Sequence, residues 1–405
     1  MDLRRQLTVV ALVYVIEGFP MGVYQNVLGV YFRRHDVSLT AIGLVSVLGF
    51  AWTAKPLWSP LVDRFGTRQD WIRGALLAMA LALVGVAWLP ASPIGPALWT
   101  ALALYCVASA TQDIAIDAYT IGLVDRGREG QANAVRMAFY RVGFIASSSL
   151  ILLPRWIGWS QTFLVGAGAT LLFVATLAWV PPIPLPPPSE RQPLRALRSW
   201  ALRPGVGAVV AFVVLYRIGD KAMGPMLSPF WVDRAFSNEE IWMFSNVLGA
   251  LATVAGAIAG GAWVARAGVV SALWWTGGLA LASNLVYAAA AAWPESGRIG
   301  VYVASGLEAV SSGAVGAAFV SYLMRICEKR YAAVQYAVLT GLYASVGTLL
   351  ASASGRIAEA TGYASYFALT AAFAAPAFLF LTPAARWMVP VDGADEGERR
   401  PVPSD

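Results

Sequence analysis

Charged side chains are scarce in this chain of 405 residues: Asp, Glu, Lys and Arg together make up 13% of it. A soluble domain of average composition carries about twice that share. Together with a hydrophobic content of 58%, this scarcity excludes a water-soluble enzyme and a disordered chain. The net charge of +6 does not indicate nucleic-acid binding, because the basic residues form short clusters between long apolar runs. That distribution is typical of a protein that crosses a membrane many times.

Cysteine and histidine are also rare. The two cysteines, Cys106 and Cys327, fall in or at the end of apolar segments, so we expect small buried side chains rather than a disulfide. His35 is the single histidine, which excludes a His-based catalytic triad. We find no Cys/His metal spacing and no glycine-rich phosphate loop, so we expect no metal, no cofactor and no ATP-driven pump.

Long hydrophobic runs are abundant. A spanning helix needs about 20 mostly apolar residues, and we count twelve such segments, although ten or eleven remain compatible with the pattern. The first is a retained helix rather than a signal peptide, because Glu17 and Pro20 interrupt it and no cleavage site follows. The predicted spans are residues 8–32, 40–62, 71–89, 96–121, 133–153, 160–180, 206–232, 240–264, 270–292, 300–325, 333–354 and 363–386.

The loops between these spans predict orientation. The side that holds both termini carries 18 Lys and Arg residues in its loops, and the opposite side carries six. The positive-inside rule therefore places both termini in the cytoplasm. The fold class we predict is an all-α integral membrane protein of twelve transmembrane helices.

A proline-rich and arginine-rich segment divides the chain almost equally. We predict an N-terminal six-helix half at 1–180, a cytoplasmic linker at 181–203, a C-terminal six-helix half at 204–388 and a disordered cytoplasmic tail at 389–405. Weak internal similarity supports two halves. Val47-Leu48-Gly49 recurs as Val247-Leu248-Gly249, and the loop that ends at Gly66 recurs in the loop that ends at Gly268. A parallel repeat of this kind is typical of major facilitator transporters.

Ten ionisable residues lie in or near the predicted spans. A charge at the centre of a bilayer costs about 2.5 to 3.5 kcal/mol on insertion scales, so such residues pair with one another or face a polar cavity. Some of them are expected to form only static ion pairs. The ten are Glu17, Asp113, Asp117, Asp220, Glu308, Lys55, Arg136, Arg141, Arg217 and Lys221.

The acidic members of this set suggest proton coupling. Asp113 and Asp117 are four residues apart, hence on one face of one helix, and like charges that close disfavour joint ionisation. Asp113 is therefore our first candidate for the coupling group, followed by Glu17, Glu308 and Asp117; Asp117 is alternatively a solvated residue near the helix end. Asp220 follows Arg217 by three residues, so we expect these two to pair.

The basic members suggest solute binding. Lys55, Arg141 and Arg217 lie farthest from the ends of the spans, and an arginine binds a carboxylate or phosphate through two parallel hydrogen bonds. Arg141 is the expected anchor for an anionic solute, although an ion pair with Asp113 is an alternative. Spans one and seven carry similar Gly and Pro interruptions beside Glu17 and Asp220, and paired interruptions in two halves point to a transporter binding site.

Several motifs, in order, resemble the AmpG-type muropeptide permeases of the major facilitator superfamily. They are Glu17-Gly-Phe-Pro-Met-Gly22, Lys55-Pro-Leu-Trp-Ser-Pro-Leu-Val-Asp-Arg64, Thr111-Gln-Asp-Ile-Ala-Ile-Asp-Ala-Tyr119, Tyr140-Arg-Val-Gly143, Tyr216-Arg-Ile-Gly-Asp220 and Gln335-Tyr-Ala337. The resemblance covers about residues 10–385. It implies the two-times-six fold of that superfamily, a solute site that includes Gln112, Tyr140, Asp220 and Gln335, and a gating loop at Asp63 and Arg64. Glu17 and Arg217 depart from the pattern expected of these permeases.

The function implied is proton-coupled import of a muropeptide-like solute across a bacterial inner membrane by alternating access, by a monomer in the lipid bilayer. Siderophore or coenzyme A ester transport by the same family is the alternative. An intramembrane enzyme that uses Asp113 and Asp117 as an aspartyl pair is a third interpretation, less favoured because such acids normally come from two different helices.

Overall fold

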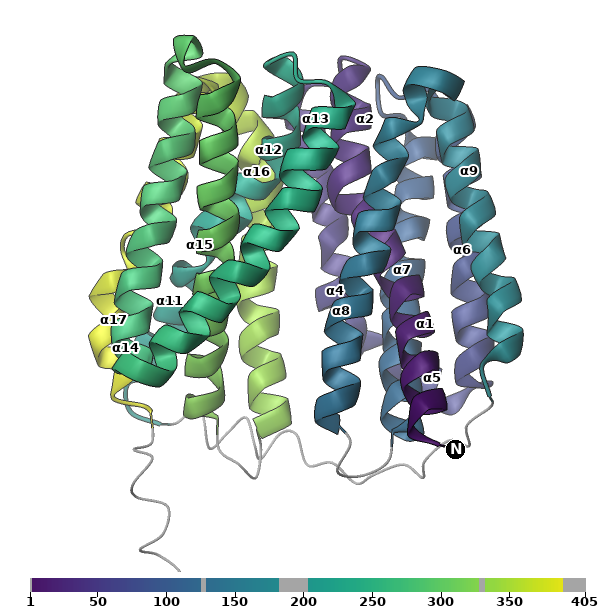
Figure 1. Ribbon diagram of the computed structural model, residues 1–405, viewed down its shortest axis with the longest axis horizontal. Coiled ribbons are helices and arrows are strands. Elements are labelled where there is room, and N and C mark those ends of the chain that lie inside the picture. Colours follow the sequence, from purple (N-terminus) through teal and green to yellow (C-terminus); the bar gives the residue numbers. More distant parts are fainter. Residues whose placement is uncertain (1, 125–128, 182–202, 328–331, 389–405) are drawn as a thin grey trace, which may run out of the picture. The chain divides into compact units, whose positions relative to one another are not determined.

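The computed structural model describes residues 2–124, 129–181, 203–327 and 332–388, and all regular secondary structure in these ranges is helical (Figure 1). The predicted tail at 389–405 and all but the ends of the predicted linker at 181–203 lie outside the described residues. Each of the twelve predicted spans falls on helix. Seven continuous helical stretches of the described chain are long and apolar enough to cross a membrane.

The first six predicted spans begin and end close to the expected residues. Their helices are α1 (Leu3–Gly22), η1 (Val23–Val27) and α2 (Leu28–Arg34); α3 (Leu39–Val45), η2 (Ser46–Gly49), α4 (Phe50–Thr53), η3 (Lys55–Leu57) and α5 (Ser59–Arg64); α6 (Arg68–Trp88); α7 (Pro96–Leu123); α8 (Glu129–Ser148) and η4 (Ser149–Leu152); α9 (Pro154–Thr176) and η5 (Leu177–Trp179). The second span is the most broken, since Pro56 and Pro60 each remove an amide donor from the helix.

The remaining spans follow the same plan. Their helices are α11 (Val206–Tyr216) and α12 (Ile218–Asp233); α13 (Asn238–Glu240), η6 (Ile241–Leu248) and α14 (Gly249–Ala292); η7 (Pro294–Ser296) and α15 (Gly297–Ile326); α16 (Ala332–Ala374) and α17 (Ala377–Ala385). Two of these helices, α14 and α16, each extend over parts of two predicted spans, and the backbone turns sharply at a glycine inside each of them.

Glycines with positive φ mark four of the turns between spans. Gly66 and Gly268 have φ of 64° and 81°, and Gly158 and Gly362 have φ of 76° and 75°. Glycine adopts this conformation without steric strain, whereas other residues rarely do. The pairs are separated by 202 and 204 residues, which is the interval that the weak internal repeat in the sequence predicts.

The described residues divide into two compact units. The first lies within 1–189, 221–251 and 348–366, and the second within 190–220, 252–347 and 367–405. In the first unit α1 contacts α7 and α8, and α6 contacts α7 and α9, so these helices run side by side (Figure 1). In the second unit α11 lies against α17, and the core contains the buried aromatic rings of Phe212, Tyr216, Phe319 and Tyr322.

Small residues bring α1 and α8 together backbone to backbone. A Cβ on Gly18 would overlap the carbonyl of Tyr140, and a Cβ on Gly143 would overlap the carbonyl of Val15. Such close contacts are typical of helices that associate within a membrane. They fix the position of α1 beside α8 at the level of Glu17 and Arg141.

Replacing Gly143 with Ala is expected to destabilise the protein by about 1 to 3 kcal/mol, because the added methyl group must push two backbones apart. Gly74→Ala in α6 is the matched control, since no atom lies within 4 Å of a Cβ built there. Thermal unfolding in detergent, followed by the loss of monodisperse protein, measures both variants. Equal stability of the two variants would contradict the proposed close contact.

Candidate functional site

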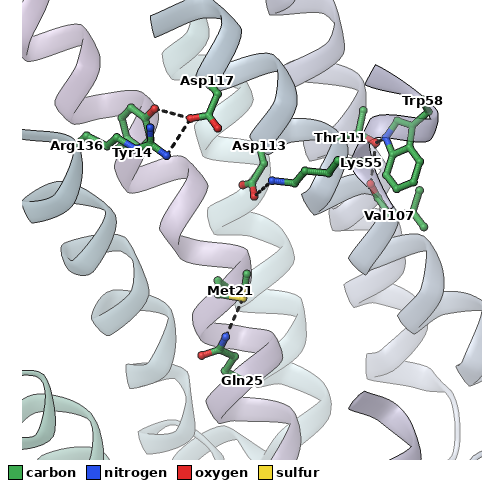
Figure 2. Close-up of polar contacts among 10 residues, drawn as sticks. All are labelled: Tyr14, Met21, Gln25, Lys55, Trp58, Val107, Thr111, Asp113, Asp117 and Arg136. Atoms are coloured by element: carbon green, nitrogen blue, oxygen red, sulfur yellow. Dashed lines mark hydrogen bonds and ion pairs between the residues drawn. The ribbon is translucent and has the colours of Figure 1, made fainter. Parts of the chain in front are cut away.

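The broken second span presents Lys55 to α7. Lys55 begins the short helix η3 after a break at Ala54, and its Nζ lies 2.7 Å from Asp113 Oδ2. The two side chains are 25% and 14% exposed, so this ion pair is largely shielded from solvent (Figure 2). The structure therefore gives Asp113 a cation from span two rather than Arg141 from span five.

Asp117, one turn further along α7, has different partners. Arg136 Nη2 lies 3.2 Å from its Oδ1, and the hydroxyl of Tyr14 donates a hydrogen bond of 2.8 Å to the same oxygen. The guanidinium of Arg136 also lies 4.9 Å from the centre of the Tyr14 ring. As Figure 2 shows, the two carboxylates on one face of α7 are each neutralised by a separate cation.

Glu17 is the acid that remains. Its side chain is 6% exposed, and its Oε2 is buried without a hydrogen-bond partner. It forms no ion pair among the described residues, although Asp113, Asp117, Arg136 and Lys55 all lie within electrostatic range of it. The cluster thus contains three carboxyl groups and two cations, and both cations are held by acids other than Glu17.

Gln112 donates a hydrogen bond to a backbone carbonyl of α1 that lacks its usual partner within the helix. Pro20 has no backbone N–H, which leaves the carbonyl of Ile16 without its usual partner four residues later. The side-chain Nε2 of Gln112, which is 1% exposed, donates to that carbonyl at 3.0 Å. Gln112 was predicted to bind solute; in this structure its amide joins α7 to the interrupted part of α1.

Arg141 and Tyr140 lie on α8 where it crosses α1. The guanidinium of Arg141 lies 5.1 Å from the centre of the Phe144 ring, and it makes no ion pair within the part of the chain that the structure describes. The side chains of Arg141 and Tyr140 are both partly exposed. Arg141 is therefore a cation whose hydrogen-bonding capacity is not already used by a carboxylate.

The second unit contains a smaller charged group. Arg217, at the break between α11 and α12, has its Nε 3.5 Å from Asp220 Oδ2, the pairing that their spacing predicts. Glu308 of α15 is partly buried and lies within electrostatic range of both. Gln335, on α16, is 2% exposed. The structure thus places Arg217, Asp220 and Glu308 together.

The gating loop is only partly visible. The side chain of Asp63 lies outside the described part of the chain. Arg64 is exposed, with its guanidinium 5.7 Å from the centre of the Phe65 ring. The role predicted for this loop therefore stays a prediction.

Three polar residues near the cluster were missed by sequence reasoning. The Nε1 of Trp58 donates to Thr111 Oγ1 at 3.1 Å, and that hydroxyl donates in turn to the carbonyl of Val107 at 2.8 Å (Figure 2). Lys55 and Trp58 thus hold the two ends of η3 against α7. Gln25 is exposed in η1, one turn beyond Met21. Trp58 and Thr111 do stand inside two of the motifs that carry the resemblance, 55–64 and 111–119, which was the available signal.

The model of one protein family, described as the Major Facilitator Superfamily, matches residues 10–352. The chain belongs to the major facilitator superfamily. It is therefore a multi-pass membrane protein and a secondary transporter of a small-molecule solute, which excludes the aspartyl-enzyme interpretation. The all-helical fold predicted from the apolar segments is confirmed.

Among curated proteins, the chain is similar to the anhydromuropeptide permease of Escherichia coli strain K12. The two are 29% identical over 345 residues, which is 81% of this chain and 69% of the permease. The predicted resemblance to AmpG-type permeases is thereby confirmed.

Solved structures show the same fold at low identity. A bacterial homologue of the human lysosomal transporter Spinster, in an inward-facing and unoccupied conformation, matches with a TM-score of 0.74 at 15% identity, covering 96% of this chain and 98% of that one. The nucleoside transporter NupG matches with a TM-score of 0.74 at 16% identity, covering 95% and 99%. At these identities the likeness concerns the fold alone.

Proposed function

We propose that this protein imports a muropeptide-like solute across the bacterial inner membrane together with protons, with both termini in the cytoplasm. The similarity to the Escherichia coli anhydromuropeptide permease over most of the chain supports the solute class. The buried, unpartnered carboxyl group of Glu17 carries the proposal of proton coupling. Transport proceeds by alternating access, in which the solute site opens to one side of the membrane and then to the other.

Glu17 is the group we propose to carry the proton. An ionised carboxylate is very unfavourable when it is buried without a cation or hydrogen-bond donor, so Glu17 is neutral in this conformation. A rearrangement that brings Lys55 or Arg136 closer would favour its ionised form and release the proton. Asp113, the first candidate from sequence, is held by Lys55 at 2.7 Å and takes the supporting role of keeping that cation away from Glu17.

Arg141 is the group we propose to bind an acidic part of the solute. A muropeptide carries peptide carboxylates, and an arginine binds a carboxylate with charge-assisted hydrogen bonds. Arg217, Lys55, Asp220, Gln335 and Tyr140 remain proposed members of the solute site, and Gln112 remains one through its place beside Glu17.

Replacing Arg141 with Gln is expected to weaken solute binding about ten- to a hundredfold, which corresponds to one charged hydrogen bond of about 1.5 to 3 kcal/mol. The half-saturation concentration for uptake into proteoliposomes measures this change. Arg155→Gln is the matched control, because Arg155 pairs with Glu239 in an exposed position outside the spans. Wild-type affinity of Arg141→Gln would assign Arg141 to packing against Phe144.

The solute class is tested by uptake into liposomes that contain the purified protein, with and without an imposed pH gradient. We expect accumulation of an anhydromuropeptide only when the outside is more acidic. A ferric siderophore and a coenzyme A ester serve as the competing solutes. Accumulation of either of these without accumulation of the anhydromuropeptide would overturn the proposed solute class.

A further inference from the structure

A groove opens between α6, α7 and the loop that follows α5. It encloses about 490 Å³, and its walls include Trp71 and Gly74 of α6 and Leu104 and Val107 of α7. All of these residues belong to the first compact unit. The volume falls within the range of about 300 to 1,000 Å³ that small-molecule sites occupy in proteins.

Small residues leave this space open. A Cβ built on Gly74 would meet no atom within 4 Å, and Ala78 and Ala108 line the groove with a single methyl group each. Further along α6 the two helices are in direct contact, since a Cβ on Gly85 would lie 3.3 Å from that of Ala101. The groove is thus confined to one end of the α6–α7 pair, the end that holds the loop after α5.

The groove opens onto an exposed apolar face of α6. Leu77, Leu81, Val84 and Trp88 are 37% to 73% exposed and recur at intervals of three and four residues, which places them on one face of the helix. Gly74 precedes Leu77 by three residues and lies on the same face. A continuous apolar face of this kind marks contact with lipid in a membrane protein, so a lipid chain reaches the groove from the side.

The length of the groove matches one leaflet of a bilayer. Along α6 it extends from Asp70 to Ala78, a separation of eight residues, which is about 12 Å of helix. The hydrocarbon core of a bilayer is about 30 Å thick, so one leaflet accounts for about 15 Å. A partner helix that crosses the membrane would need a groove along the full thickness. The groove therefore fits an acyl chain that enters from one face of the membrane.

Arginines lie at the mouth of the groove. The loop after α5 lies at the same end of the first unit as the N-terminus (Figure 1). Arg64 is exposed there beside the Phe65 ring, and it forms no ion pair with any described residue. The carboxylate of Asp70 lies 3.6 Å from Arg73 and accepts the amide and the hydroxyl of Thr67 at 3.1 and 2.6 Å. The negative charge at the mouth is thus already compensated, whereas Arg64 is available to a phosphate.

We propose that this groove binds one acyl chain of an anionic phospholipid, with the lipid phosphate at Arg64 and Arg73. The segment 63–73 contains three arginines and two aspartates, so its net charge is positive and complements an anionic headgroup. Basic pockets between membrane helices on the cytoplasmic side bind such headgroups. The site is separate from the proposed solute site and serves a different ligand.

Thr111 connects the groove to the broken second span. The consecutive helices α6 and α7 run in opposite directions, so Thr111 lies near the mouth of the groove and Leu104 lies at its deep end. Thr111 accepts a hydrogen bond from Trp58, which directly follows η3. A lipid chain in the groove packs beside this contact and stabilises the position of span two on α7.

Native mass spectrometry of the purified full-length chain in detergent counts bound lipids directly. We expect one phosphatidylglycerol molecule to bind more tightly than any further copies. Phosphatidylcholine and phosphatidylethanolamine with the same chains should bind about fivefold more weakly, the effect of about one basic residue on an anionic headgroup. The measurement needs neither solute nor a pH gradient, so its failure is distinguishable from failure of the proposed function.

Gly74→Leu fills the groove and is expected to weaken phosphatidylglycerol binding about tenfold, because the displaced acyl segment loses on the order of ten carbon–carbon contacts. Gly168→Leu is the matched control. Gly168 is also exposed on a helix of the first unit, and no atom lies within 4 Å of a Cβ built there. Added phosphatidylglycerol should raise the unfolding temperature of the wild type and of Gly168→Leu, but not that of Gly74→Leu.

Arg64→Gln tests the headgroup and keeps the proposal testable where Gly74→Leu is poorly expressed, because Arg64 is exposed. It is expected to weaken phosphatidylglycerol binding about fivefold. Arg4→Gln is its control, since Arg4 is exposed at the same end of the unit outside the groove. Equal affinity of Gly74→Leu and Gly168→Leu, or of Arg64→Gln and Arg4→Gln, would overturn the proposal, as would equal affinity of the wild type for the three lipids.

Discussion

Glu17→Gln is expected to abolish accumulation of the solute against its gradient while leaving exchange between pre-loaded liposomes largely intact. Gln has nearly the same shape as a protonated Glu and cannot release a proton. The variant should therefore complete the transport cycle with an uncharged side chain at position 17. This matches the environment of Glu17 in the structure, which is buried and has no ion-pair partner among the described residues. The accumulation ratio under an imposed pH gradient, measured beside the exchange rate, separates coupling from transport as such.

Glu239→Gln is the control for this variant, because it also removes one carboxyl group. Glu239 lies outside the spans, and hydrogen bonds from a backbone amide and from Arg155 hold the pKa of its carboxyl below the usual range. It is therefore ionised at neutral pH and is not expected to carry a proton. If Glu17→Gln still concentrates solute and Asp113→Asn does not, Asp113 is the coupling group, as the spacing of Asp113 and Asp117 first suggested.

Breaking the ion pair between Lys55 and Asp113 is expected to have the largest effect on stability. Removing one partner of a buried pair leaves an uncompensated charge, which typically costs 3 to 5 kcal/mol. Because the two side chains are 25% and 14% exposed, we expect about 3 kcal/mol, the lower end of that range, for Lys55→Met. Unfolding by denaturant in mixed micelles, compared between variant and wild type, measures the loss.

The double variant Lys55→Met/Asp113→Asn distinguishes an ion pair from two independent effects. It should be more stable than Lys55→Met alone, because the second substitution removes the charge that Lys55→Met leaves unpaired. Glu239→Gln, which breaks the exposed pair with Arg155, should lower stability by no more than about 1 kcal/mol. If the loss of stability in the double variant equals the sum of the losses in Lys55→Met and Asp113→Asn, then Lys55 and Asp113 do not stabilise each other.

The fold was predictable because long apolar segments have few alternatives. A bilayer admits helices and closed barrels only, and runs of about 20 apolar residues such as 71–89 are too long for strands of a barrel. The turns at Gly268 and Gly362 were also visible, since polar or small residues separate the spans there. The boundaries agree to within a few residues for the same reason: loops carry the charge that the spans lack.

The pairing of charges was predictable only within one helix. Arg217 and Asp220 form the ion pair that a separation of three residues implies. Lys55 and Asp113, in contrast, are 58 residues apart, and their contact depends on which helices are neighbours and where span two breaks. Spacing does not contain that information, so the sequence suggested Arg141 as the alternative partner of Asp113 and gave no indication of Lys55. The isolation of Glu17 follows only once the other partners are assigned.

The ion pair between Arg33 and Asp233, and the hydrogen bond from Tyr363 to the same carboxylate, were invisible in the sequence for a similar reason. Arg33 and Asp233 are 200 residues apart, and each alone resembles an ordinary charge in a loop. Tyr363 follows a glycine at a turn between two spans and belongs to none of the recognised motifs. Arg33 and Tyr363 both contact the carboxylate of Asp233, and this becomes apparent only when the three segments are placed in space.

The central claim is that solute and protons move together through Glu17, and solute-driven proton flux tests it most directly. Liposomes that contain the protein and a trapped pH-sensitive dye are given an anhydromuropeptide from outside, with no imposed pH gradient. The wild-type protein is expected to acidify the lumen as the solute enters, and Glu17→Gln is expected to leave the luminal pH unchanged. Uptake of the solute by the wild-type protein without any change in luminal pH would contradict the account.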